Sequence, residues 1–147
     1  MSIFNISKNI SHFLKNNPNS GLKTKLYNIQ NIKLTSDLKP YIHFNNKNYK
    51  RNLVYLDNLI EVLIICWRPG QYSPFHLHAK KGCLFKILSG NLTEILLTKD
   101  KKYIRKNYKT NDIAYIDNLI GEHRMINESN KNCISLHFYS PSDISKY

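Results

Sequence analysis

The first hydrophobic pattern in the chain is that of a helix. Within residues 2–16 the apolar positions recur every three or four residues, which places them on one side of a helix: Ile3, Ile6, Ile10, Phe13 and Leu14. Ser2 is a residue type that caps the first turn of such a helix. The run Asn16–Gly21 ends it, because Asn, Pro and Gly interrupt helices, and a second, weaker helix is expected over residues 22–32.

Residues 1–36 contain neither Asp nor Glu, a composition that is also typical of organellar transit peptides. Such peptides are rich in Arg, however, and this segment has none. We therefore favour a helical N-terminal segment, residues 1–36, that packs on the folded domain.

From residue 41 onward the pattern changes to short β-rich runs bounded by turn residues. Nine strands are predicted: 41–44, 50–56, 60–67, 82–88, 92–97, 103–108, 112–116, 123–127 and 133–139. Ser89-Gly90-Asn91 is typical of a hairpin turn between the fourth and fifth of them. Strands of this number and spacing indicate an antiparallel sandwich or barrel, with the helices covering one face or end.

The length of 147 residues fits a single domain, 1–147, in which the barrel covers residues 40–142. No run of about 18 apolar residues is present, so we expect no membrane span. The three cysteines form no Cys-x-x-Cys pair, and their odd number argues against a disulfide framework. A structural zinc ribbon is therefore not expected, and the reducing cytoplasm is the expected compartment.

The net charge of +12 supports two interpretations. One is an electrostatic surface for nucleic acid or for an acidic membrane surface. The other is a solvated basic surface, which would also attract small anionic substrates. The lysines are spread along the chain rather than gathered in one stretch. We favour the second interpretation and keep a non-catalytic, nucleic-acid-binding domain as an alternative.

The stretch from Gly70 to His78 carries the candidate chemistry. His76 and His78 are one residue apart, so on a β-strand their side chains point to the same side. His123 follows in a second Gly-containing motif. Three imidazoles would hold a divalent metal and leave coordination positions open. The spacing alone does not separate iron from zinc with an activated water.

Several separated motifs resemble known families. Gly70, His76-x-His78, Cys83 and Gly90 resemble the first cupin signature, with Cys83 where Glu is usual, and His123-x-x-x-Asn127 resembles the second. From about residue 40 to residue 142 the chain is similar to cysteine dioxygenase in five further motifs: Tyr49-Lys-Arg51-Asn-Leu-Val54, Cys66-Trp67, Lys86-Ile-Leu-x-Gly90-Asn-Leu-x-Glu94, Ile120-Gly-x-His123-Arg and Ser135-Leu-His137-x-Tyr139-Ser-Pro141. The resemblance implies an all-β dominated fold, a small cupin (jelly-roll) β-barrel with N-terminal helices packed outside.

The resemblance also implies an activity. It predicts a non-haem Fe(II) thiol dioxygenase of cysteine catabolism that oxidises L-cysteine with O2 to cysteine sulfinic acid, with His76, His78 and His123 as iron ligands. The expected partners are a small-molecule thiol and O2, without nucleic acid or membrane, and we expect a monomer. The alternatives are a dioxygenase of 3-mercaptopropionate or cysteamine, and the basic cupin that binds nucleic acid.

Arg51 and Tyr49 match the family's substrate-carboxylate clamp, and an Arg fork suits a carboxylate better than a Lys does. As a residue in a basic cluster, Arg51 would instead be a surface charge. The favoured interpretation predicts cysteine as the substrate.

Ser135, His137 and Tyr139 alternate, so on a strand they share one face. The resemblance implies a hydrogen-bonded relay that ends with Tyr139 beside the iron, and a thioether crosslink between Cys83 and Tyr139. It also implies a cis bond at Ser140-Pro141. A half-buried strand with polar side chains toward solvent, and an inert buried cysteine, are the simpler alternatives.

Overall fold

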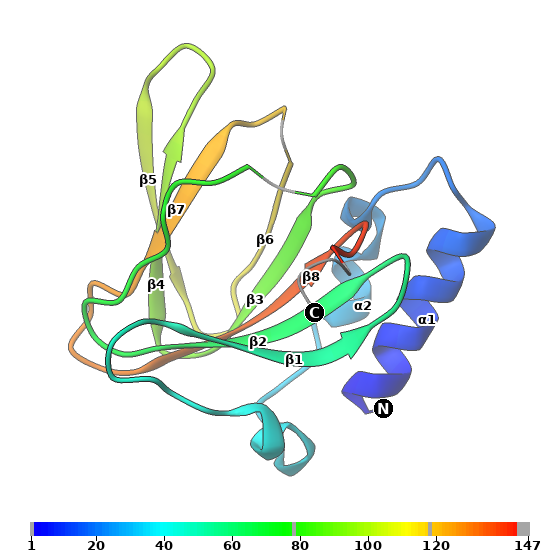
Figure 1. Ribbon diagram of the computed structural model, residues 1–147, viewed down its shortest axis with the longest axis horizontal. Helices are drawn as coiled ribbons and strands as arrows, with labels where there is room; N and C mark the ends of the chain where they lie inside the picture. The colour runs from blue at the N-terminus through cyan, green and yellow to red at the C-terminus, as the bar shows by residue number, and fades with distance from the viewer. Residues whose placement is uncertain (1, 78, 118, 144–147) are drawn as a thin grey trace.

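The computed structural model describes residues 2–77, 79–117 and 119–143 (Figure 1). Its helical elements are α1 (Ile3–Asn16), η1 (Leu22–Lys25), α2 (Leu26–Ile29) and η2 (Ser36–Tyr41). Its strands are β1 (Lys50–Leu56), β2 (Glu61–Trp67), β3 (Cys83–Ser89), β4 (Asn91–Leu97), β5 (Tyr103–Lys109), β6 (Ile113–Ile116), β7 (Glu122–Ile126) and β8 (Cys133–Tyr139). Among the described residues, no helix has the length and apolar content needed to cross a bilayer.

The strands form two antiparallel sheets. One has the order β1-β2-β8-β3-β6 and the other the order β5-β4-β7. The predicted barrel is thus built as two sheets that pack against each other, with α1 beside the larger one (Figure 1). β8, which comes last in sequence among the described strands, lies in the middle of the larger sheet, between β2 and β3.

Both faces of the larger sheet are buried, and each face packs in a separate hydrophobic core. On one face the side chains of β2, β3 and β8 pack against the helical segment; this core includes Ile10, Leu14, Ile64, Leu84 and Phe138. On the other face they pack against β4 and β7; this core includes Ile65, Trp67, Phe85, Leu96 and Met125. Because strand side chains alternate between faces, β2 is apolar at every residue from Val62 to Trp67 and is buried on both faces.

The N-terminal helix forms where the hydrophobic spacing predicts it. Ser2 caps α1, since its Oγ accepts a hydrogen bond from the backbone N–H of Asn5 at 3.2 Å. The second predicted helix is shorter than residues 22–32 and ends at Ile29. Lys86 Nζ donates to the carbonyl oxygens of Gln30 at 2.6 Å and Ile29 at 3.4 Å, so a buried ammonium from β3 holds the end of this segment.

The prediction of a strand over residues 41–44 is wrong. The 3₁₀-helix η2 extends through Tyr41, and the backbone N–H of Ile42 donates to the carbonyl of Lys39 at 3.1 Å. The segment continues a helical turn rather than pairing with a neighbouring strand: the carbonyl of His43 accepts from the Asn52 side chain at 3.1 Å, and the first strand begins only at Lys50.

The predicted hairpin around Gly90 is a turn of a different kind. Gly90 has the positive φ of 87° that the turn requires, and a Cβ there would lie 2.5 Å from the carbonyl oxygen of Asn132. The strands on either side do not pair with each other, however, because β3 pairs with β6 and β8 whereas β4 pairs with β5 and β7. The turn therefore carries the chain from one sheet to the other.

Candidate active site

His76 and His123 come together at one edge of the smaller sheet. The segment that carries His76 is not a regular strand, but it forms an isolated bridge with His123 on β7. The backbone N–H of each residue donates to the carbonyl of the other, at 3.0 and 3.1 Å. This double hydrogen bond aligns the two side chains, and their Nε2 atoms lie 2.9 Å apart.

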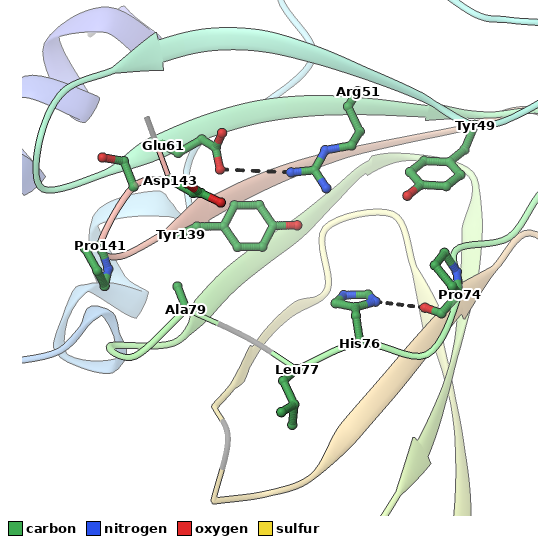
Figure 2. A pocket seen from close by; sticks show the side chains of 11 residues that line it. Tyr49, Arg51, Glu61, Pro74, His76, Leu77, Ala79, Tyr139, Pro141 and Asp143 are labelled. Atoms are coloured by element: carbon green, nitrogen blue, oxygen red, sulfur yellow. Dashed lines mark hydrogen bonds and ion pairs between the residues drawn. The ribbon is translucent and has the colours of Figure 1, made fainter. Parts of the chain in front are cut away.

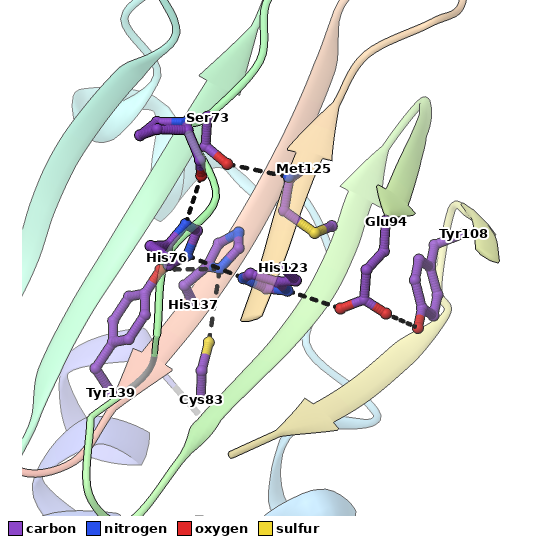
Figure 3. A network of polar contacts seen from close by, with 10 residues as sticks. Ser73, His76, Cys83, Glu94, Tyr108, His123, Met125, His137 and Tyr139 are labelled. Atoms are coloured by element: carbon purple, nitrogen blue, oxygen red, sulfur yellow. Dashed lines mark hydrogen bonds and ion pairs between the residues drawn. The ribbon is translucent and has the colours of Figure 1, made fainter. Parts of the chain in front are cut away.

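The second nitrogen of each ring has its own acceptor. His76 Nδ1 lies 2.8 Å from the carbonyl oxygen of Pro74, and His123 Nδ1 lies 2.7 Å from a carboxylate oxygen of Glu94. Each acceptor places the ring proton on Nδ1, so both Nε2 atoms present lone pairs. Figure 2 shows His76 beside Pro74, and Figure 3 shows the two rings with Glu94 behind His123.

Two such lone pairs repel unless a proton or a metal cation lies between them. Two imidazole nitrogens bound to one metal ion at bond lengths of about 2.0–2.1 Å, on neighbouring coordination positions, are about 3 Å apart. The separation of 2.9 Å therefore fits a pair of ligands to one divalent metal. His78, the third predicted ligand, lies outside the described residues; without it, no three His, Cys, Asp or Glu side chains gather into a metal site in the part of the chain that the structure describes.

Behind His123 the structure places a buried carboxylate. Glu94 on β4 accepts from His123 and also from the Tyr108 hydroxyl, at 3.0 Å. The His123 and Glu94 side chains are only 3% and 5% exposed, so their contact is shielded from water. A carboxylate behind an imidazole fixes the orientation of the ring and raises the basicity of its other nitrogen.

A cleft of about 490 Å³ opens beside His76 (Figure 2). Arg51 and Tyr49 line it, as does Tyr139 from β8. Tyr49 stacks on Trp67, with ring centroids 4.7 Å apart, and the Arg51 guanidinium lies 5.7 Å from the centre of the Tyr139 ring. Arg51 NH2 is also 4.0 Å from Glu61 Oε1. The cleft thus brings together a cation, two phenols and one predicted metal ligand.

Ser135, His137 and Tyr139 lie on the same face of β8, with Ser135 and His137 fully buried. The indole N–H of Trp67 donates to Ser135 Oγ at 2.9 Å, and Ser135 Oγ lies 2.7 Å from His137 Nε2. Tyr139 Oη is 3.4 Å from His137 Nδ1. Because an indole only donates, the Ser135 hydroxyl hydrogen is available to His137 Nε2, which leaves the His137 proton on Nδ1, toward Tyr139.

Cys83 lies directly opposite Tyr139 in the register of β3 and β8. Its thiol is free and buried, with Sγ 3.9 Å from His137 Nδ1. Burial raises the pKa of the Cys83 thiol and raises the pKa of the Tyr139 hydroxyl well above its usual value of 10.0. Both groups are therefore protonated at neutral pH. The Ser140–Pro141 bond that follows is cis, as predicted.

A family model described as cysteine dioxygenase type I matches residues 22–146. The chain belongs to this family. Cysteine dioxygenase type 1 from Rattus norvegicus is 39% identical over 110 residues, which cover 69% of this chain and 55% of that protein. The chain thus spans about half the length of the curated dioxygenases that it matches. The prediction of the family from the separated motifs is confirmed.

Solved structures confirm the predicted cupin fold of this cysteine dioxygenase family member. A Klebsiella pneumoniae protein with a double-stranded β-helix domain matches with a TM-score of 0.63 at 19% identity, covering 76% of this chain and 93% of that one. A cupin superfamily protein from Desulfitobacterium hafniense matches with a TM-score of 0.56 at 11% identity, covering 69% and 84%. At such identities the likeness concerns the fold.

The sequence did not predict the contacts that three further residues make in this dioxygenase-family site. Glu94 stands in a recognised motif, and Trp67 follows Cys66 in another, but neither motif says which side chain each would contact. Glu61 was visible as an acid at the start of the apolar run that forms β2. A charged residue that precedes six buried apolar ones is a signal of a specific partner, since buried charges are otherwise costly.

Proposed function

We propose that this chain is an Fe(II)-dependent thiol dioxygenase that converts L-cysteine and O2 into cysteine sulfinic acid. Both oxygen atoms end on sulfur, so RSH and O2 give RSO2H with no other reductant. The observation that carries the proposal is the convergence of the His76 and His123 Nε2 lone pairs beside a cleft that also presents Arg51 and Tyr139. Membership of the cysteine dioxygenase type I family supports it.

The metal would be held by His76, His123 and His78, the last proposed from its sequence spacing alone. Three neutral histidines leave the full +2 charge on the ion and open positions beside it, unlike the usual set of two His and one carboxylate. Fe(II) bound there would supply a redox-active Lewis acid for a thiolate, an amine and dioxygen. Glu94, by holding the Nδ1 proton of His123, keeps the Nε2 lone pair available to the ion.

The thiol's carboxylate would bind the Arg51 guanidinium, with Tyr49 beside it. A planar fork of N–H donors matches the two oxygens of a carboxylate and selects against thiols that lack one. The cleft has ample room for a molecule of this size. Tyr139 would donate its hydroxyl hydrogen to the carboxylate or to an oxygen in transfer, because its raised pKa keeps the proton in place. His137, held by Ser135, would orient that hydroxyl.

We also propose that Cys83 and Tyr139 form a thioether crosslink. Bond formation between Sγ and a ring carbon of Tyr139 breaks one S–H and one C–H bond, and dioxygen takes up the two hydrogen atoms as hydrogen peroxide. The register of β3 and β8 supports this pairing, because it places the two residues opposite each other on the cleft side. Mass spectrometry of the purified protein would detect a crosslinked peptide that lacks two hydrogens and disappears in Cys83→Ser.

The central experiment is oxygen uptake by the Fe(II)-loaded protein with L-cysteine, 3-mercaptopropionate and cysteamine, with the sulfinate quantified. The proposal predicts stoichiometric sulfinate from cysteine. Uptake with another thiol alone would retain the chemistry but overturn the assignment of cysteine. Absence of uptake with all three thiols, at full iron occupancy, would overturn the enzyme itself.

Arg51→Lys tests the carboxylate contact, because it keeps the positive charge beside Glu61 and removes only the planar fork. The KM for cysteine should rise about tenfold or more, as expected for a lost charge-assisted hydrogen bond. The KM for cysteamine, which has no carboxylate, should stay the same. An equal rise for both thiols would contradict the role of Arg51.

A further inference from the structure

Glu61 is the buried acid of the cleft. It begins β2, where it lies opposite Leu56 of β1 and Tyr139 of β8. Its side chain is 2% exposed, whereas that of Arg51, 4.0 Å away, is 38% exposed. Figure 2 shows the Glu61 carboxylate and the Arg51 guanidinium side by side along one wall of the cleft, above Tyr139. The two residues therefore form one charged unit, with the acid deeper than the cation.

A carboxylate removed from water in this way requires compensation by a cation or by hydrogen bonds. Its position also affects Arg51, whose long side chain would otherwise sample many rotamers. One terminal nitrogen of the guanidinium faces Glu61, and the plane approaches the Tyr139 ring at 5.7 Å. Arg51 is thus restrained by a charge at one end and by an aromatic ring beside it.

The distance between the Glu61 carboxylate and the Arg51 guanidinium determines how strongly the two groups interact. At 4.0 Å the contact is at the outer limit of an ion pair, far from a short bidentate clamp. Such a contact orients one terminal nitrogen of the guanidinium and keeps its planar fork intact. Because Glu61 is the more buried partner, a carboxylate that enters the cleft from solvent meets Arg51 first.

We propose that Glu61 is a positioning residue that holds the Arg51 guanidinium in place for the carboxylate of the thiol substrate. The inference rests on the proposed function, in which Arg51 binds that carboxylate. Glu61 lowers the entropic cost of ordering Arg51 on binding, and so it favours thiols that carry a carboxylate over thiols that do not.

Glu61→Gln tests this role, since it preserves shape and removes the charge. The KM for L-cysteine should rise about three- to tenfold, the scale of ordering one long side chain on binding. The kcat for cysteine, and both constants for cysteamine, should stay unchanged. Glu128→Gln is the matched control, because Glu128 pairs with the exposed Arg105 outside the cleft.

A double-mutant cycle separates positioning from a general effect on the fold. In the Arg51→Lys background no planar fork remains to be oriented, so Glu61→Gln should cause no further rise in the KM for cysteine. Additive effects would overturn the proposal. A lower KM in Glu61→Gln would also overturn it, because Glu61 would then be a competitor of the substrate. An equal change for cysteamine would indicate a merely structural role.

Binding without turnover keeps this test independent of the enzyme proposal. Trp67 is the single tryptophan of the chain and stacks on Tyr49 in the cleft, so its fluorescence reports binding of cysteine without oxygen. If no thiol is oxidised but Glu61→Gln still weakens this binding three- to tenfold, the proposed function fails and the role of Glu61 stands. If cysteine is oxidised and Glu61→Gln changes neither KM nor this binding, only the role of Glu61 fails.

Discussion

The two faces of β8 differ in what they bury. Toward the helices the strand presents Ile134, Leu136 and Phe138, which pack in an apolar core. Toward the smaller sheet and the cleft it presents Ser135, His137 and Tyr139, also buried or nearly so. The first face is stabilised by the removal of apolar surface from water, which depends on volume and shape. The second depends on specific partners for each polar atom.

This difference shows how one strand serves stability and chemistry together. On the apolar face any side chain of suitable size retains the fold. On the polar face the contacts are specific. Ser135 accepts a hydrogen bond from Trp67 and contacts His137, which in turn contacts Tyr139. Substitutions on the two faces should therefore separate cleanly into losses of stability and losses of activity.

The largest expected effect is on the apolar face. Phe138→Ala removes a fully buried ring and should lower the free energy of unfolding by about 3–5 kcal/mol. Activity per folded molecule should remain near that of the wild type. Denaturant unfolding measures the change, and Leu119→Ala, at a residue that is 79% exposed, is the control. A loss of activity without a loss of stability would contradict the separation of the faces.

The next effect concerns the support of the predicted metal ligands. Glu94→Gln keeps an oxygen acceptor for His123 but removes the negative charge, so affinity for divalent metal should fall about 10- to 100-fold. Chelator competition measures this affinity without any turnover. Glu128→Gln should leave it unchanged. Metal affinity equal to that of the wild type would mean that the charge of Glu94 does not support a metal bound to His123.

A smaller effect is expected at the end of β8. Tyr139→Phe removes the hydroxyl and keeps the ring, so kcat should fall about 5- to 10-fold, the equivalent of one hydrogen bond. Metal content should not change, because Tyr139 is not among the proposed ligands. Steady-state oxygen uptake and metal analysis together test this. A parallel loss of iron would assign Tyr139 a different role.

The smallest effect concerns the pH dependence of folding stability, which is flat near neutral pH and should change only in alkali. Burial raises the pKa of Tyr139 above 10.0 and raises that of Tyr115 to about 12. In the unfolded chain these phenols ionise near pH 10, while in the fold they remain protonated. Their contribution to stability is therefore complete below pH 10 and is lost as the pH rises beyond it. Unfolding from pH 8 to 12 should show this decline, and it should be shallower in Tyr115→Phe.

The sequence predicted the bounds of the helices and strands better than it predicted which strands pair. The helical spacing of Ile3 to Leu14 located α1, and the turn residues located eight of the strands to within one residue at each end. The strand predicted at 41–44 failed because a short apolar run has no period that separates a strand from a turn. The turn at Gly90 was correct, but which strands pair across it depends on contacts far away in the chain.

The site was predictable as a set of residue types and less so as a geometry. His76 and His123 are recognisable by their motifs, whereas their Nε2 separation depends on a bridge between distant segments. Arg51 was recognisable, but its neighbour Glu61 was not. Arg51 lies opposite Ile65 and Glu61 lies opposite Leu56, so their contact depends on how the two side chains extend along the sheet. The sequence therefore predicts which residues belong to the site, but not the contacts between side chains that strand pairing brings together.

The place of β8 has a consequence for how the chain folds. Among the described strands β8 comes last in sequence but lies between β2 and β3, so the larger sheet has a gap at its centre until residues 133–139 are made. During synthesis β2 and β3 would expose unpaired edges and an uncovered apolar face, both of which favour aggregation. Contacts between segments so distant in sequence also slow folding. A nascent chain stalled before β8 should therefore depend on chaperones, and Ser135, His137 and Tyr139 join the site only when β8 pairs with β2 and β3.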